Sequence, residues 1–386
     1  MIPSRLERAR LIGRRHRREG DPTVSQPTSP TLQPFPASSA QAHQARHLLA
    51  LPGDVEVDEV ETLAVSRFAG ARWDVAPSGT DPLTPAPRTA KPGEPGVLRT
   101  SRHTTLTGPY SPWSADGVNP GLPPGTDQVF DVVCPRDRGD APIPGGGDRD
   151  GVGRAFPAGL PTREEERVIS WLVEVARRLG GSIRVDTANA ASPAVVLTPD
   201  PGVAVDMSVF SDVWLDPQAA MAVVGAVHPR VVLATEGSPY QGPPQGIGEL
   251  PLYRGETLDP DLRRALHAQA DDIDIVALTS GKVLDGYGLL VDMGVDGLVA
   301  VEVGGEEQLP LLLRNLPWAS QGAVAYRVRW EPRDLVESQM EVPSFELKIA
   351  RKRAAELVAT VTRSLYAAVG GEIADEADFL VDPQDV

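Results

Sequence analysis

The chain has 386 residues, enough for two or more domains, with a formal net charge of −16 at pH 7 and a single cysteine. This charge disfavours binding to nucleic acid or to anionic membranes, and one cysteine excludes an intrachain disulfide and a cysteine-rich zinc site. No apolar run reaches the ~20 residues of a membrane span, and no apolar stretch follows the basic N-terminus as in an export signal, so we expect a cytoplasmic protein.

The first third of the chain is predicted to contain little packed structure. Residues 1–45 combine an arginine-rich beginning with a stretch of Pro, Ser, Thr and Gln, which indicates a disordered arm. Residues 46–75 contain an apolar stripe at helical spacing and are predicted to form a docked helix. Residues 76–126 are rich in proline and glycine with almost no apolar periodicity, which indicates a linker.

Clear strand and helix patterns begin at residue 127. Gln128–Cys134 is β-branched and aromatic, which is typical of a strand. Thr162 and Glu165 have the spacing of a capping box, and an apolar stripe follows them as far as two consecutive glycines. The sequence therefore predicts a helix over 162–179, with Leu172 on its buried face and Glu164 exposed.

The rest of the chain alternates strand and helix patterns. Strands are predicted at 182–186, 194–198, 203–210, 230–235, 273–278, 287–292, 298–303 and 323–330. Helices are predicted at 216–227, from 258 onward, at 306–316 and from Ser344.

The order of these elements indicates an α+β fold. Residues 128–235 follow approximately β-α-β-β-α-β, the split βαβ or ferredoxin-like order, and residues 250–330 approximate it with one extra strand. We predict either tandem ferredoxin-like modules or one mixed sheet covered by helices. The module boundaries would be 127–240 and 241–335, followed by a C-terminal helix at 344–371 and an acidic tail at 372–386.

The common catalytic and nucleotide-binding motifs are missing from the sequence. Gly145-Gly146-Gly147 lacks the Lys and Ser/Thr of a P-loop, and no Gly-x-Ser-x-Gly elbow occurs. Cys134 shares its predicted strand face with Phe130 and Val132, which favours a buried structural thiol over a nucleophile. The sequence therefore predicts no cofactor and no metal, and it identifies no catalytic residue.

The loop after Cys134 carries the densest mixture of opposite charges in the chain. Arg136, Asp137, Arg138 and Asp140 are the candidate ligand-binding residues, because clustered opposite charges can form a polar site. The alternative is a solvated loop whose charges have no ligand.

Two classes of function remain open. The first is a non-catalytic interaction or regulatory module whose acidic surface binds a basic partner protein or a second copy of the chain. The second is an enzyme whose site is assembled from scattered Asp, Glu and Arg residues. A concave pocket that gathers charged side chains would favour the enzyme, and flat acidic faces or an exposed apolar patch would favour the binding module.

Overall fold

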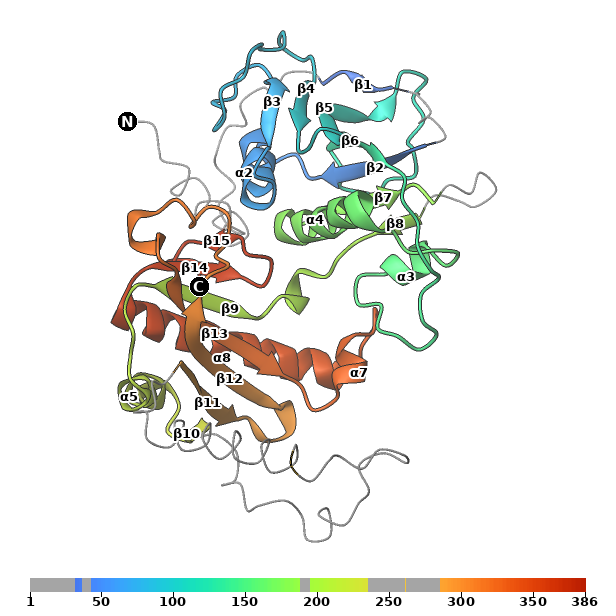
Figure 1. The fold of residues 1–386 in the computed structure, drawn as a ribbon. Coiled ribbons are helices and arrows are strands. Elements are labelled where there is room, and N and C mark those ends of the chain that lie inside the picture. Colours follow the sequence, from blue (N-terminus) through green and yellow to red (C-terminus); the bar gives the residue numbers. More distant parts are fainter. Residues whose placement is uncertain (1–31, 37–42, 188–194, 235–260, 262–284) are drawn as a thin grey trace, which may run out of the picture.

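The computed structural model describes residues 32–36, 43–187, 195–234, 261 and 285–386 (Figure 1). These residues form two separate sheets, one in each half of the chain. The protein is therefore mixed α+β, as the sequence predicts, and the alternative of one mixed sheet is wrong. No helix in the described part of the chain combines the length and hydropathy that a membrane crossing requires. Most of the predicted N-terminal arm lies outside the described residues.

The N-terminal half is an eight-stranded sheet with two helices on one face. Its strands follow the order β3-β4-β5-β6-β2-β7-β8 and pair antiparallel, while the short β1 pairs parallel with β5. Trp171 and Leu172 lie in the core between the sheet and the helices. In chain order the elements are β1 (Pro34–Phe35), β2 (Gln44–Leu51), α2 (Val57–Arg67), β3 (Arg72–Val75), β4 (Gly96–Arg99), β5 (Thr105–Ser114), β6 (Gln128–Pro135), α3 (Val152–Ala155), α4 (Arg163–Leu179), β7 (Ser182–Val185) and β8 (Val195–Leu197).

The C-terminal half is a seven-stranded antiparallel sheet in the order β10-β11-β12-β13-β9-β14-β15. Helices α5 and α8 cover one face, around Val209 and Tyr326. Phe210 and Leu313 lie on the opposite face. In chain order the helices and strands are β9 (Met207–Ser211), α5 (Pro217–Val227), β10 (Val231–Ala234), β11 (Gly286–Asp292), β12 (Leu298–Glu306), β13 (Ala323–Glu331), α7 (Leu335–Ser338), α8 (Phe345–Val369), β14 (Glu372–Asp375) and β15 (Leu380–Val381).

The two halves have the same topology. From β2 to β8 and from β9 to β15 the chain follows one series of strands and helices, including a one-turn helix (α3 or α7) before the long helix (α4 or α8). The sheet orders also match, because the first strand of each series lies between the fifth and the sixth. The pairing register agrees as well: Leu49 of β2 pairs with Ile183 of β7, and Val209 of β9 pairs with Ile373 of β14. The described chain is therefore an internal structural repeat, with one unit at 44–197 and the other at 207–381.

A pair of glycines marks the same position in both units. Helix α4 ends at Gly180-Gly181 and α8 ends at Gly370-Gly371, immediately before the next strand. A Cβ atom on Gly181 would overlap the Ala50 carbonyl oxygen, and one on Gly371 would overlap the Phe210 carbonyl oxygen. Both units therefore need a glycine where the chain leaves the long helix and approaches the backbone of the central strand.

Several expected boundaries differ from the observed elements. Residues 76–126, predicted to be a linker, contain β4 and β5, whose Leu98 and Leu106 are fully buried. Proline and glycine interrupt the alternation there, and Gly108 is needed because a Cβ atom at that position would overlap the Phe130 ring. Residues 46–75 contain strands β2 and β3 in addition to the predicted helix.

The C-terminal end and the split βαβ order also need correction. Residues 372–386, predicted to be an acidic tail, contain β14 and β15. The range 306–316, predicted to be helical, ends β12 and then forms turns that bury Leu309 and Leu313. Each observed unit has three more strands than a β-α-β-β-α-β unit, and the repeat begins at β2, not at residue 127. The predicted elements at 258 and 273–278 lie outside the described residues, apart from Asp261.

The helix α4 begins in a different way from the prediction. Thr162 is the N-cap residue, but its side chain makes no capping hydrogen bond, so the capping box is wrong. Glu165, its predicted partner, is instead fully buried beneath the sheet. Glu164 is not exposed, because its carboxylate accepts hydrogen bonds from Ser101 Oγ (2.5 Å) and Thr104 Oγ1 (2.8 Å) in the β4–β5 turn. These bonds lower the pKa of Glu164.

The two units contact each other through α4 and the β14–β15 turn. Arg178 Nη1 lies 2.7 Å from Asp375 Oδ2, and its Nη2 donates to the Leu380 carbonyl oxygen. Phe379, in the same turn, packs into the core of the N-terminal unit. The helix face of the N-terminal unit therefore meets the second sheet, and α8 lies on the far side of that sheet (Figure 1).

Candidate functional site

The four candidate residues predicted from the sequence lie beside the beginning of α4. Arg136 Nη2 contacts Asp186 Oδ2 at 2.7 Å, and Arg138 Nη2 contacts Glu165 Oε1 at 2.8 Å. The backbone N–H of Asp137 donates to Glu165 Oε2 at 2.8 Å. The structure therefore brings three of the candidates together around two carboxylates of the protein itself.

The remaining candidate, Asp140, is exposed, and its backbone carbonyl accepts a hydrogen bond from Leu160 N–H. The guanidinium of Arg138 also lies over the Phe156 ring, 4.2 Å from its centre. These contacts hold the loop against the body of the N-terminal unit. Because much of the loop's charge is paired with other groups of the protein, no ligand is needed to explain it.

Beneath this loop lies a buried cluster of His47, Cys134 and Glu165. One ligand atom from each residue lies within 4.8 Å of the others, and all three side chains are fully buried. His47 Nδ1 accepts a hydrogen bond from the Asp186 backbone N–H at 3.1 Å, so the ring proton is on Nε2. That nitrogen lies 3.2 Å from Glu165 Oε1, a close electrostatic contact without hydrogen-bond alignment.

This cluster fits neither a metal centre nor a nucleophilic site. A metal ion would need the lone pair of His47 Nε2, but that atom carries the proton, and the guanidinium of Arg138 contacts the same Glu165 oxygen. Burial, together with the negative charge of Glu165, raises the pKa of the Cys134 thiol, so the thiol stays protonated. The cluster is therefore a structural contact between β2, β6 and α4.

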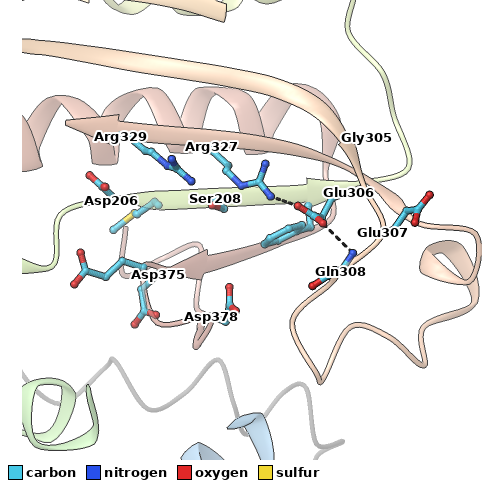
Figure 2. Close-up of a pocket in the computed structure, with 13 residues that line it drawn as sticks. Asp206, Ser208, Gly305, Glu306, Glu307, Gln308, Arg327, Arg329, Asp375 and Asp378 are labelled. Atoms are coloured by element: carbon cyan, nitrogen blue, oxygen red, sulfur yellow. Dashed lines mark hydrogen bonds and ion pairs between the residues drawn. The ribbon is translucent and has the colours of Figure 1, made fainter. Parts of the chain in front are cut away.

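A larger concave site lies at the junction of the two units. Its main cavity, of about 790 Å³, opens on the face of the C-terminal sheet opposite α8 (Figure 2). Two adjoining cavities, of about 410 and 240 Å³, lie between α4 and the β14–β15 turn. Glu376 lines all three, and we refer to these three neighbouring cavities together as the inter-unit cleft.

Charged side chains dominate the main cavity. They come from the residue before β9, the end of β12, β13, the end of β14 and the β14–β15 turn, and most of them are labelled in Figure 2. Among the described residues of its lining, carboxylates outnumber guanidiniums six to two: they are Asp206, Glu306, Glu307, Asp375, Glu376 and Asp378, with Arg327 and Arg329. The wall therefore carries an excess of negative charge at neutral pH.

Ion pairs fix the floor of the cleft. Arg177, only 6% exposed, lies 2.5 Å from Asp150 and 3.4 Å from Glu376. Arg149 also contacts Glu376, at 3.0 Å. Within the main cavity, Arg327 pairs with Glu306. Arg177 lies in the last turn of α4, from which its guanidinium contacts Glu376 in the β14–β15 turn.

Several carboxyl groups in the cleft have raised pKa values because burial removes water from them. Burial is the main cause at Asp206, Glu376 and Asp378. At Glu174, on the α4 side, it raises the pKa to about 7. The arginines named above only partly offset this effect. A positively charged ligand would favour the ionised form of each group, so the cleft is electrostatically suited to a cation.

Sequence reasoning missed this site. Asp375, Glu376 and Asp378 lie in the segment that was predicted to be an acidic tail, and Asp206 lies in a predicted strand without a recognisable partner. The run of three carboxylates within four residues was the one local signal, but it is also the pattern of a solvated terminus. No protein family model matches the chain, and no curated protein and no solved structure shows significant similarity to it.

Proposed function

We propose that the protein is a non-catalytic binding module that takes a basic segment of a partner protein into the inter-unit cleft. The observation that carries the proposal is the group of desolvated carboxylates, Asp206, Glu376 and Asp378, in a cavity large enough for several side chains. Lysine or arginine side chains of a partner would add positive charge beside these groups, which the arginines of the cleft offset only in part.

The chemistry of the lining favours binding over catalysis. Within the described part of the chain, the residues that line the three cavities of the cleft include no histidine, cysteine or lysine. A hydrolase or transferase commonly uses such a group as nucleophile or base. The carboxylates at Asp375 and Glu376 are already held in ion pairs with arginines, which suits a fixed electrostatic surface.

One observation favours the alternative, an enzyme with a site of scattered carboxylates. Glu174, with a pKa of about 7, lines the same cavities as Glu376. A carboxyl group with a pKa near neutrality can act as a general acid or base. In that case Glu174→Gln would abolish turnover of a small cationic substrate, whereas binding of a basic peptide would persist in this variant if the protein is a binding module.

The proposal is tested by fluorescence anisotropy with an arginine-rich peptide and an acidic peptide of equal length. We expect the full chain to bind only the basic peptide, and we expect this binding to weaken between about 0.05 and 0.5 M salt, because the Debye length falls about threefold.

Two matched pairs of substitutions separate the effect of the cleft carboxylates on binding from the effect of the overall charge. Asp378→Asn with Glu307→Gln removes two carboxylates of the cleft, and Asp116→Asn with Glu356→Gln removes two exposed ones elsewhere. The first pair should weaken binding at least about tenfold, and the second should change it less than about twofold. Equal effects of the two pairs, or equal binding of both peptides, would refute the proposal.

A further inference from the structure

The N-terminal unit shows how a segment binds beside β5, which is the equivalent of β12. In that unit β1 pairs parallel with the second half of β5, and Ser111 N–H donates to the Gln33 carbonyl oxygen at 2.8 Å. Phe35 is buried on the face opposite α4, with its ring centre 5.9 Å from that of Tyr110. The segment is thus an added strand with one aromatic anchor.

Arg46 holds the same segment from the central strand. Its guanidinium lies 4.6 Å from the centre of the Phe35 ring, and its Nη2 donates to the Pro36 carbonyl oxygen at 3.0 Å. Leu48, two residues further along β2, lies in the same small core as Phe35. A charged residue and an apolar residue of β2 therefore contact this strand.

The internal repeat places the main cavity of the inter-unit cleft at the equivalent position. In the first unit β4 and β5 pair as far as Gly96 and Gly108, and in the second β11 and β12 pair as far as Gly286 and Gly304. Beyond Gly108, β5 has a register shift between Thr107 and Tyr110 and then pairs with β1 from Ser111 onward.

The strand registers identify the equivalent residues. Tyr110 pairs with Val129 and Gly304 pairs with Ala325, at matching positions of the two sheets. Ser111 therefore corresponds to Gly305, which lines the main cavity. Among the described residues, no strand pairs with β12 on its β11 side at Gly305 and Glu306.

The side chains at this position differ between the units in size and in charge. By the register of the central strands, Ser208 stands where the first unit has Leu48, and Asp206 stands where it has Arg46. Ser208 leaves room above the sheet, and Asp206 replaces a cation with an anion. The position in the second unit is therefore suited to a positively charged extended segment, whereas Arg46 in the first unit suits a negatively charged one.

We propose that the partner segment binds as an added β-strand, parallel to β12 at Gly305–Glu307, in the way that β1 binds β5. This inference rests on the proposed function and specifies its mode. A bulky apolar side chain of the segment lies over Ser208, and a flanking arginine or lysine faces Asp206 and Asp378. Main-chain hydrogen bonds to Gly305 supply affinity, and the two side-chain positions supply specificity.

The test uses the full chain and a short peptide in which arginines flank one phenylalanine. A second peptide has the same sequence with N-methyl groups on alternate backbone nitrogens, so that its charge is unchanged but it cannot pair as a strand. We expect N-methylation to weaken binding at least about tenfold. Ser208→Leu, which fills the position as Leu48 does in the first unit, should have an effect of similar size.

Three outcomes are distinguishable. Equal binding of the two peptides, together with unchanged binding by Ser208→Leu, would overturn the strand mode while the proposed function stands. Absence of binding by either peptide would refute the proposed function and this inference with it. A tenfold gain in affinity when Arg14, Arg15, Arg17 and Arg18 are replaced by Gln in the full chain would assign the cavity to the chain's own arginine-rich segment and overturn the assignment to a partner.

Discussion

Replacement of Glu174 by glutamine should stabilise the protein at alkaline pH and not at acidic pH. Glu174 lies on α4 in the inter-unit cleft, with one carboxylate oxygen buried and without a hydrogen-bond partner. Its nearest cation is Arg67, whose Nη2 lies 3.7 Å away. Burial raises its pKa from 4.5 to about 7, so ionisation of this group opposes folding.

The size of the expected stabilisation follows from the pKa shift of Glu174. Each pKa unit corresponds to about 1.4 kcal/mol, so the ionised Glu174 costs about 3 kcal/mol of folding free energy above pH 7. Because the folded-state pKa is the higher one, the folded protein binds the extra proton, and this contribution to stability is lost as pH rises from about 4.5 to about 7. The attraction to Arg67 is already included in this shift, because it lowers the pKa against the effect of burial, so glutamine, which avoids the charge, should give a net gain of about 3 kcal/mol.

Urea unfolding at pH 4.5 and pH 8.5 measures the effect. We expect the free energy of unfolding of Glu174→Gln to exceed that of the parent by about 3 kcal/mol at pH 8.5 and to match it within about 0.5 kcal/mol at pH 4.5. Glu166→Gln, on the exposed face of the same helix, is the control and should differ little at either pH. A pH-independent difference for Glu174→Gln would show that its carboxyl group is not desolvated.

Three further predictions concern the internal packing. Gly370→Ala, whose Cβ atom would meet no neighbour, should cost about 1–3 kcal/mol in urea unfolding from backbone strain alone, because φ 69° with ψ −152° is a conformation that essentially only glycine adopts, and Gly371→Ala should cost more, because its Cβ atom would also overlap the Phe210 carbonyl oxygen. Leu172→Ala should cost about 2–5 kcal/mol, since the side chain is fully buried, and equal stability of variant and parent would contradict its place in the core. The Cys134 thiol should react slowly with a maleimide in the native protein and quickly in denaturant, and rapid native labelling would revive its role as a nucleophile.

The sequence predicted the elements whose apolar periodicity is regular. Strand β6 and helices α4, α5 and α8 lie close to their expected positions, because each combines a continuous apolar pattern with a clear beginning or end. Strand β2 was missed, since a central strand buried on both faces shows no alternation and resembles a helix segment. Strands β4 and β5 were missed because proline and glycine interrupt them, although tertiary contacts bury their apolar residues.

The candidate site could not be predicted, because its residues are far apart in the sequence and only the fold brings them together. Asp206 and Glu376 are 170 residues apart in the sequence, and both line the main cavity only because β9 pairs with β14 in the centre of the second sheet. The charged loop at Arg136–Arg138 was visible in the sequence, but its partners Glu165 and Asp186 were not. A search by composition therefore finds charged residues that are close together in the sequence. It misses carboxyl groups that the fold buries away from water, and such groups distinguish the cleft.

The two repeats follow one another along the chain without exchanging strands, and this has a consequence for biosynthesis. Every pairing within the N-terminal sheet is complete at Leu197, before the first residue of β9 leaves the ribosome. The first unit can therefore fold while the second is being translated. The central strand β9 must wait for β14 near the C-terminus, because Val209 pairs with Ile373. Until then β9 can pair with β13 along one edge only, and its other edge has no partner, so folding of the second unit should be the slow and aggregation-prone stage.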